Sequence, residues 1–241
     1  MKHPPDSAPI SLMFSGGVDS TAAAMVLAER HERVHLLTFA NGFGHYGFGR
    51  TERRVVELKT RYGARIVSHL RAIRPLVEAL SVSTLMDDYR RFGSGFVWCL
   101  GCKLAMHVAS TQYDLAHGIA QHTDGSSGDT SEMVEQMPAA LALIRRFYED
   151  HGIAFGPTGY EVPRAEKQAR LRAAGFRMGL PIRDRALGIQ PSCIPGELYY
   201  LPFLLLGRRP VHPEHEVTAY IQAKRPLMDR LVRAGLPGEG A

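Results

Sequence analysis

The feature of this sequence that most constrains its fold is the segment Ser15-Gly16-Gly17-Val18-Asp19-Ser20. It follows a short apolar run, residues 10–14, and precedes an alanine-rich stretch, residues 21–30, that favours a helix. Two glycines between a strand and a helix let the backbone turn sharply and bring amide N–H groups close to an anion. The helix N-terminus adds partial positive charge at the same place. The segment therefore predicts a loop that binds phosphate.

Strand and helix patterns alternate on either side of this loop. Residues 34–39, 64–68 and 113–117 favour strands, and residues 51–62 and 103–112 favour helices. Alternation of this kind predicts βαβ units, hence an α/β fold with a parallel sheet and helices on both faces. Later segments favour helices, namely 130–150, 164–174 and 214–234. The apolar residues 201–207 are expected to lie in the core, and ligands are expected at the carboxyl ends of the strands.

Composition excludes several classes of protein. In 241 residues there is no apolar run long enough to span a membrane. The start of the chain has no apolar signal-peptide region, and three cysteines are an odd number for a secreted disulfide framework. We therefore expect a cytoplasmic protein that does not contact a membrane. Basic residues concentrate in 50–74 and 162–185, whereas 114–135 carries only acidic charges, a pattern that suits a phosphate-rich partner.

Two common nucleotide motifs are missing from the first strand–helix junction. It contains neither the GxxxxGK[ST] of kinase-type P-loops nor the GxGxxG of dinucleotide folds. A plain Gly-Gly turn with an Asp or Ser helix cap is the alternative interpretation. The pattern SGGxDS in this position resembles the signature of the PP-loop ATP pyrophosphatases, also called adenine nucleotide alpha hydrolases. The resemblance implies a Rossmann-like catalytic domain over residues 8–200, followed by a helical extension over residues 201–241.

The same resemblance implies chemistry at the α-phosphorus of ATP with Mg²⁺, in which a substrate oxygen attacks and pyrophosphate leaves. Asp19 would orient Mg²⁺ or the reacting groups, and Met13 and Phe39 would lie near adenine. The residues expected to hold the pyrophosphate are Ser15, Gly16, Gly17 and Ser20, with a further hydroxyl from Thr21.

Many enzymes of this superfamily carry a GHxxDD-like motif after the fourth strand, and here that motif is only partly matched. Gly118 fits the position of close approach to the nucleotide, but the paired acids do not align. Asp124 and Asp129 are candidate Mg²⁺ ligands, because Mg²⁺ binds carboxylate oxygens. A solvated acidic loop that caps the next helix is the alternative.

The three cysteines form a CxxC pair, Cys99 and Cys102, with Cys193 much later in the chain. Three thiolates are suited to a [4Fe–4S] cluster with one iron left open. This order resembles the cluster-dependent tRNA thiolation enzymes such as tRNA 2-thiocytidine synthetase. The alternatives are persulfide chemistry without a metal, as in the tRNA 2-thiouridylases, a zinc site with a histidine as fourth ligand, or three inert buried thiols.

These observations favour an ATP-dependent sulfurtransferase that adenylates a carbonyl oxygen and replaces it with sulfur, with Asp19 and the three cysteines as catalytic residues. Its partners would be ATP, a tRNA base or a small-molecule acceptor, and sulfide or a sulfur-donor protein; a homodimer is left open. A ligase that uses ammonia, similar to the deazaguanine nitrile synthases, is the second hypothesis. A nucleotide- or metal-binding module without catalysis is the third.

Overall fold

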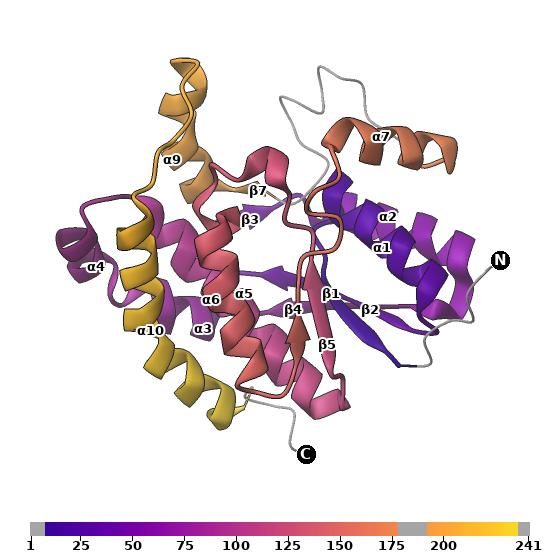
Figure 1. Cartoon of the computed structure of the whole chain (residues 1–241), viewed down its shortest axis with the longest axis horizontal. Helices are drawn as coiled ribbons and strands as arrows, with labels where there is room; N and C mark the ends of the chain where they lie inside the picture. The colour runs from indigo at the N-terminus through magenta and orange to yellow at the C-terminus, as the bar shows by residue number, and fades with distance from the viewer. Residues whose placement is uncertain (1–7, 178–191, 236–241) are drawn as a thin grey trace.

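The computed structural model describes residues 8–177 and 192–235 (Figure 1). Its main element is a five-stranded parallel sheet with the strand order β4-β2-β1-β5-β6. The strands are β1 (Ile10–Met13), β2 (Val34–Ala40), β4 (Ile66–Ala72), β5 (Gln121–Asp124) and β6 (Ala154–Phe155). A small antiparallel ladder joins β3 (His45–Tyr46) to β7 (Ser192–Cys193).

Helices cover both faces of the sheet. They are α1 (Val18–Arg30), α2 (Phe48–Tyr62), α3 (Arg74–Val77), α4 (Leu85–Phe92), α5 (Phe96–His117), α6 (Pro138–Glu149), α7 (Arg164–Ala173), α9 (Ile194–Leu205) and α10 (Glu214–Ala234). Short turns of other helix types occur at Gly63–Arg65, Glu78–Val82, Gly128–Thr130 and Val134–Gln136. In Figure 1, α1, α2 and α7 lie on one side of the sheet and α3, α5, α6 and α10 on the other.

Two hydrophobic cores follow from the alternation of side chains along the strands. Leu36 of β2 packs with Leu27 of α1 and Leu58 of α2 on one face. Its neighbour Leu37 points to the other face and packs in the cluster that contains Val108 of α5. The structure thus confirms the α/β fold with a parallel sheet between two helical layers. No helix in the described part of the chain is both long and apolar enough to cross a membrane.

Three expectations about local structure are wrong. Residues 113–117 belong to α5 rather than to a strand, because Tyr113 packs in the core on one face of this helix and Gly118 ends it in the left-handed conformation. Residues 130–150 are not one helix, since α6 begins at Pro138, a residue favoured in the first turn. The segment 201–207 is not core: Leu205 is 75 % exposed, because α9 stands away from the body.

A cluster of histidines between the sheet and the C-terminal end of α5 predicts that the stability of the fold depends on pH. His35 Nδ1 lies 2.7 Å from the Tyr113 hydroxyl, which also contacts His69 Nε2 at 2.7 Å, and His117 stacks on the Tyr113 ring. Burial, followed by the charges of His69, His117 and Arg33, lowers the pKa of His35 from 6.5 to about 4.

Because unfolded His35 binds a proton at a higher pH than folded His35, the free energy of unfolding should fall as the pH drops from about 6.5 to about 4. The expected loss is on the order of 2 kcal/mol, measured by urea unfolding at a series of pH values. His35→Asn should flatten this dependence. An equally steep pH dependence in that variant would contradict the assignment to His35.

Candidate functional site

The predicted phosphate loop lies at the carboxyl end of β1 and leads into α1. Gly16 has a φ of +78°, which a side chain would strain, and a Cβ there would lie 3.0 Å from the Thr51 backbone. The Thr51 hydroxyl donates to the Ser15 carbonyl at 2.8 Å and fixes the loop from α2. The Ser15 and Ser20 hydroxyls lie 3.1 Å apart at its mouth. The loop therefore presents hydroxyls and the N-terminus of α1 together, an arrangement that suits an anion.

Two members of the predicted set are held by other groups. The Thr21 hydroxyl donates to the Gly17 carbonyl at 2.6 Å and is buried inside α1, away from the mouth of the loop. Asp19 accepts from Arg164 at 2.6 Å and from Lys167 at 3.0 Å, both on α7. Sequence reasoning missed these two cations, although they belong to the basic segment 162–185, whose last residues lie outside the described ranges. They bring two positive charges beside the phosphate loop.

A second loop, after β5, closes against the phosphate loop. A Cβ on Gly125 would lie 2.7 Å from the backbone nitrogen of Ser20, so only glycine allows this close approach. Gly118, the predicted residue of close approach, is instead the C-cap of α5 and precedes β5, at the opposite edge of the sheet. Gly125 therefore occupies the position at the carboxyl end of a strand that the sequence analysis assigned to Gly118.

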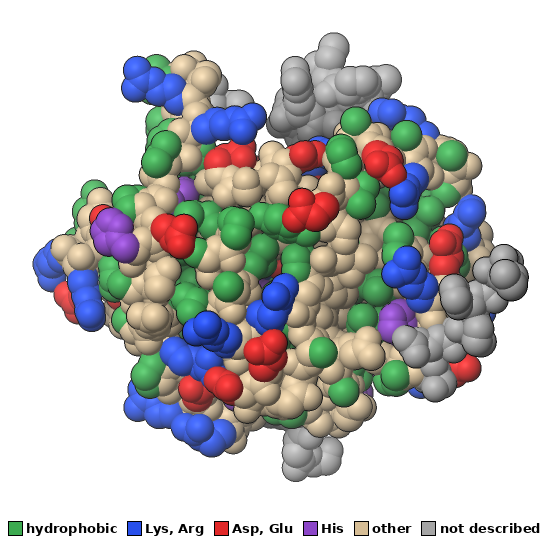
Figure 2. All heavy atoms as spheres, in the orientation of Figure 1, with side chains coloured by type: hydrophobic (Ala, Val, Ile, Leu, Met, Phe, Trp, Pro, Cys, Tyr) green, Lys and Arg blue, Asp and Glu red, His purple; other side chains and the backbone are tan. Residues whose placement is uncertain are grey.

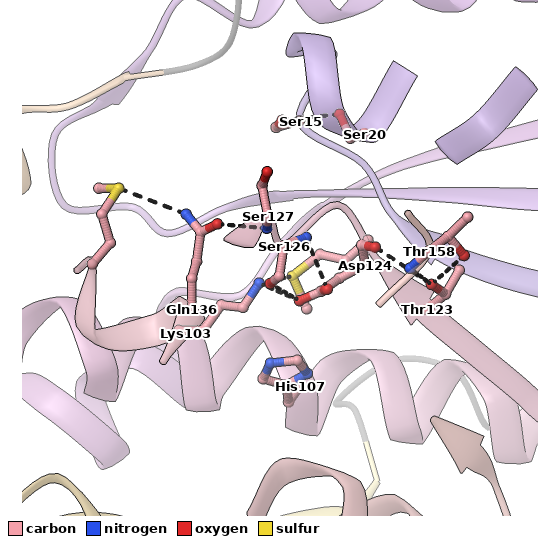
Figure 3. A network of polar contacts seen from close by, with 12 residues as sticks. Ser15, Ser20, Lys103, His107, Thr123, Asp124, Ser126, Ser127, Gln136 and Thr158 are labelled. Atoms are coloured by element: carbon pink, nitrogen blue, oxygen red, sulfur yellow. Dashed lines mark hydrogen bonds and ion pairs between the residues drawn. The ribbon is translucent and has the colours of Figure 1, made fainter. Parts of the chain in front are cut away.

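Asp124 is buried next to Lys103 and Ser126, two residues that line the cavity described below (Figure 3). Its carboxylate accepts from Lys103 Nζ at 3.0 Å and from the Ser126 amide and hydroxyl at 3.0 and 2.9 Å. Burial alone would raise the pKa of Asp124, but the Lys103 ammonium outweighs it and lowers the pKa to about 2. Asp129, in contrast, accepts from the backbone amide of Arg164. Asp124 therefore connects the end of β5 to α5, and Asp129 connects its own loop to the first residue of α7.

One cavity of about 570 Å³ connects these groups. Ser15, Asp19 and Ser20 line one part of it, and Met13 and Phe39, at the ends of β1 and β2, line another. Lys103 also lines the cavity, with its Nζ 3.3 Å from Met13 Sδ. The cavity thus lies at the carboxyl ends of the parallel strands, as expected for a ligand site in this type of sheet.

All three cysteines line the same cavity, and none forms a disulfide. Cys99 and Cys102 lie in the first turns of α5, whereas the β3–β7 ladder places Cys193 opposite His45. The Asn41 amide lies 3.6 Å from the sulfur of Cys102 and 3.5 Å from that of Cys193. The fold therefore brings the late cysteine to the CxxC pair, and Asn41, which follows the last residue of β2, contacts two of the three thiols.

The environment of the CxxC pair keeps its thiols neutral. Burial raises the pKa of Cys99 far above its usual range and that of Cys102 to about 12, and the Glu135 carboxylate contributes to both shifts. Glu135 lines the cavity, and its Oε2 is buried without a hydrogen-bond partner. A neutral thiol is a poor nucleophile, whereas a bound metal displaces its proton. Burial also raises the pKa of Glu135, so burial opposes negative charge at all three groups.

Within the described ranges, no group of three or more Cys, His, Asp or Glu side chains is arranged to hold a metal ion. The three thiols therefore share one cavity without forming a metal site in this part of the chain.

Comparisons with known proteins agree with this fold. No family model and no curated protein match the sequence. A 4-thiouridine synthetase solved with RNA and bound ATP aligns with 94 % of this chain at 13 % identity and a TM-score of 0.54. The U34-tRNA thiolase NcsA from Methanococcus maripaludis, solved with its [4Fe-4S] cluster, aligns with 93 % at 14 % identity and a TM-score of 0.51. The chain has the fold of these thiolation enzymes.

The thiolation-enzyme fold covers nearly the whole of this chain but not the whole of the neighbours. The chain spans about half of the synthetase, 53 %, and 73 % of the thiolase. The resemblance to PP-loop enzymes suggested by residues 15–20 is thus confirmed for the fold. At this identity the chemistry must be argued from the residues of this chain.

Proposed function

We propose that this chain is an ATP-dependent sulfurtransferase that modifies an RNA base. The observation that carries the proposal is that one cavity is lined both by the phosphate loop and by all three cysteines. An adenylated acceptor held beside the loop would then lie next to a source of sulfur. The acceptor's carbonyl oxygen attacks the α-phosphorus, and the bond to pyrophosphate breaks. Hydrosulfide then adds at the activated carbon, AMP leaves with the oxygen, and the proton of the sulfur passes to solvent.

The phosphate loop supplies the binding of ATP. Backbone amides of Gly16 and Gly17, with the hydroxyls of Ser15 and Ser20, would hold the leaving pyrophosphate at the N-terminus of α1. Arg164 and Lys167 lie beside this loop on Asp19, where their charges favour the developing negative charge. Mg²⁺ binds one or two carboxylates together with substrate phosphates, and Asp19 is the carboxylate of the loop itself. Because both of its oxygens accept from Arg164 and Lys167, Mg²⁺ would replace one of these cations at Asp19. Met13 and Phe39 offer an apolar surface for adenine.

The cysteines supply the sulfur chemistry. Cys99, Cys102 and Cys193 would hold a [4Fe–4S] cluster, whose open iron supplies a binding position for sulfide. The raised pKa of Cys99 and Cys102 disfavours a free persulfide mechanism at these two residues, because it lowers the fraction of thiolate. Asn41 would orient Cys102 and Cys193 through its amide. Sulfide itself or a sulfur-donor protein would replenish the sulfur.

An RNA acceptor is favoured by the basic surface next to the phosphate loop. The structure joins the two basic segments: Arg61 of α2 donates to the Ala174 carbonyl just after α7, and the Arg54 guanidinium lies over the Phe176 ring. The exposed cations on these two helices are Arg53, Lys59, Arg61, Arg164, Arg170 and Arg172. Cations spread in this way match the phosphates of a nucleic acid.

The experiment that tests the proposal is purification of the full chain without oxygen, followed by assays for iron and acid-labile sulfide. We expect close to one four-iron cluster per chain, lost separately in Cys99→Ala, Cys102→Ala and Cys193→Ala. Sulfur incorporation into RNA should disappear in the same three variants. Ser20→Ala serves as the matched control: it should slow the release of AMP and pyrophosphate while the iron content stays unchanged.

The outcomes separate the hypotheses. Iron-free protein after reconstitution would remove the cluster from the proposal. AMP release that requires ammonia rather than sulfide would favour a ligase. Failure to cleave ATP with any acceptor would leave a binding module without catalysis.

A further inference from the structure

The helix α9 carries a surface that the candidate site does not use. It begins immediately after Cys193 and stands away from the rest of the protein, at the upper left of Figure 1. One of its faces packs on the chain: the Tyr199 ring stacks near His212 at 6.2 Å between centroids, and Tyr200 lines the cavity. The helix is therefore anchored along one side only.

The opposite side of α9 is an exposed apolar stripe, which we define as Ile194, Leu198, Leu201 and Leu205. These side chains are 51, 64, 43 and 75 % exposed. Their spacings of four, three and four residues place them along one face of a helix. The same spacing is the seam by which one helix packs against another in a coiled coil. Leucines exposed in this number and order, next to an equally exposed Leu206, indicate an interface.

The apolar stripe has an acidic residue near its N-terminal end and two basic residues beyond its C-terminal end. Glu197 lies in the first turn of α9 and is exposed, with its carboxylate accepting from the Tyr46 hydroxyl at 2.9 Å. Arg208 and Arg209 follow the last turn. Figure 2 shows basic side chains at the outer end of this protrusion. The stripe itself contains no charged residue. A partner must therefore offer an apolar helix face with acidic charge near Arg208 and basic charge near Glu197.

We propose that α9 pairs in antiparallel orientation with α9 of a second copy of this chain, about a two-fold axis. With Leu198 against Leu205 of the partner subunit, Glu197 of each copy lies near the arginines that follow the partner's helix. The stripe is its own complement in this orientation, as a two-fold interface requires. A parallel pair would place the arginines of both copies side by side, where like charges repel.

The expected strength of this dimer follows from its size. A helix of 12 residues is about 18 Å long, so one helix pair buries less than the roughly 800 Å² per partner of a standard interface. We therefore expect a reversible dimer with a dissociation constant in the micromolar range. The proposal does not depend on the sulfurtransferase reaction, because none of the four stripe residues lines the cavity, although Glu197 beside them does.

The test is the mass of the full chain by sedimentation equilibrium at concentrations from about 1 to about 100 μM. Wild-type protein should pass from monomer to dimer across this range. Leu198→Glu combined with Leu205→Glu should remain monomeric, with a dissociation constant raised at least about 100-fold by four like charges at the seam. Leu115→Glu is the matched control, because Leu115 is 49 % exposed on α5, away from α9, and this variant should dimerise like wild type.

Charge reversal tests the orientation. Arg208→Glu with Arg209→Glu should weaken the dimer, and adding Glu197→Arg to the same chain should restore it. Circular dichroism and thermal melting establish that each variant is folded. A wild-type chain that stays monomeric throughout the range would overturn the proposal. A dimer that persists in the double leucine variant would also overturn it, because association would then use another face. A dimer that charge reversal leaves unaffected would exclude the antiparallel pairing.

Discussion

Gly125→Ala is expected to weaken ATP binding about 100-fold. The added Cβ would lie 2.7 Å from the nitrogen and 2.8 Å from the Cα of Ser20, and both are backbone atoms that cannot swing aside. The loop after β5 or the first turn of α1 must then move, and the amides and hydroxyl that we propose to hold the phosphates move with it. A misplacement of roughly 1 Å can cost a factor of about 100 where an enzyme positions reacting groups, and we expect a loss of similar size for phosphate groups held by several donors. Titration calorimetry with ATP and Mg²⁺ measures the change directly.

Gly49→Ala is the control for this prediction. Gly49 lies in α2, a Cβ there meets no atom within 4 Å, and its φ is not positive. Alanine at this helical position should leave ATP affinity unchanged and raise stability by about 0.5–1 kcal/mol. Equal ATP affinity in Gly125→Ala and wild type would show that the two loops do not need their close approach.

The phosphate loop could be predicted from the sequence because its determinants are local. A strand, two glycines and a helix within about twenty residues leave few alternatives for the backbone. The strand β2 and the helix α10 are local in the same sense, since their apolar periodicity is complete within each segment. These elements match the expectations nearly residue for residue.

The sequence did not indicate Gly125 as the glycine of close approach, because the end of α5 is set by packing against residues far away in the chain. Residues 113–117, Tyr-Asp-Leu-Ala-His, were expected to form a strand after the helix at residues 103–112. In the folded chain they continue a 22-residue helix, with Tyr113 buried against the sheet. The strand therefore begins later, and the glycine that follows it is Gly125. Packing of Tyr113 against the sheet therefore outweighs the strand preference of the residues around it.

The sequence could not indicate that Lys167 would pair with Asp19, or that Asn41 would contact the cysteines, for a related reason. Lys167 is 148 residues from Asp19, and Asn41 is 152 residues from Cys193. No periodicity connects such positions, and only the fold brings them together. The apolar stripe on α9 was mistaken for core for a different reason. A run of leucines indicates an apolar surface that some other surface covers, but it does not say whether that surface belongs to the same chain.

Lys103→Met is expected to lower the free energy of unfolding at pH 8 by about 3 kcal/mol, because it leaves a buried carboxylate without its counter-charge. In wild type the lowered pKa of Asp124 contributes stability that is complete above its ordinary value of 3.8 and is lost as the pH falls toward about 2. Without the ammonium, burial raises this pKa instead. The sign then reverses, and the variant should lose stability as the pH rises from the ordinary value of 3.8 toward the raised pKa.

Urea unfolding at pH 5 and pH 8 separates this electrostatic effect from a loss of packing. Methionine keeps most of the length of the Lys103 side chain, so a packing defect would be equal at both pH values, whereas an unpaired Asp124 costs more at pH 8. Adding Asp124→Asn to Lys103→Met removes the second charge and should recover most of the loss at pH 8. The double variant would then fold without the ion pair, and any defect in the proposed ATP turnover that remains would measure what Lys103 and Asp124 contribute together. A pH-independent deficit in the single variant would rule out the charge of Asp124 as its cause.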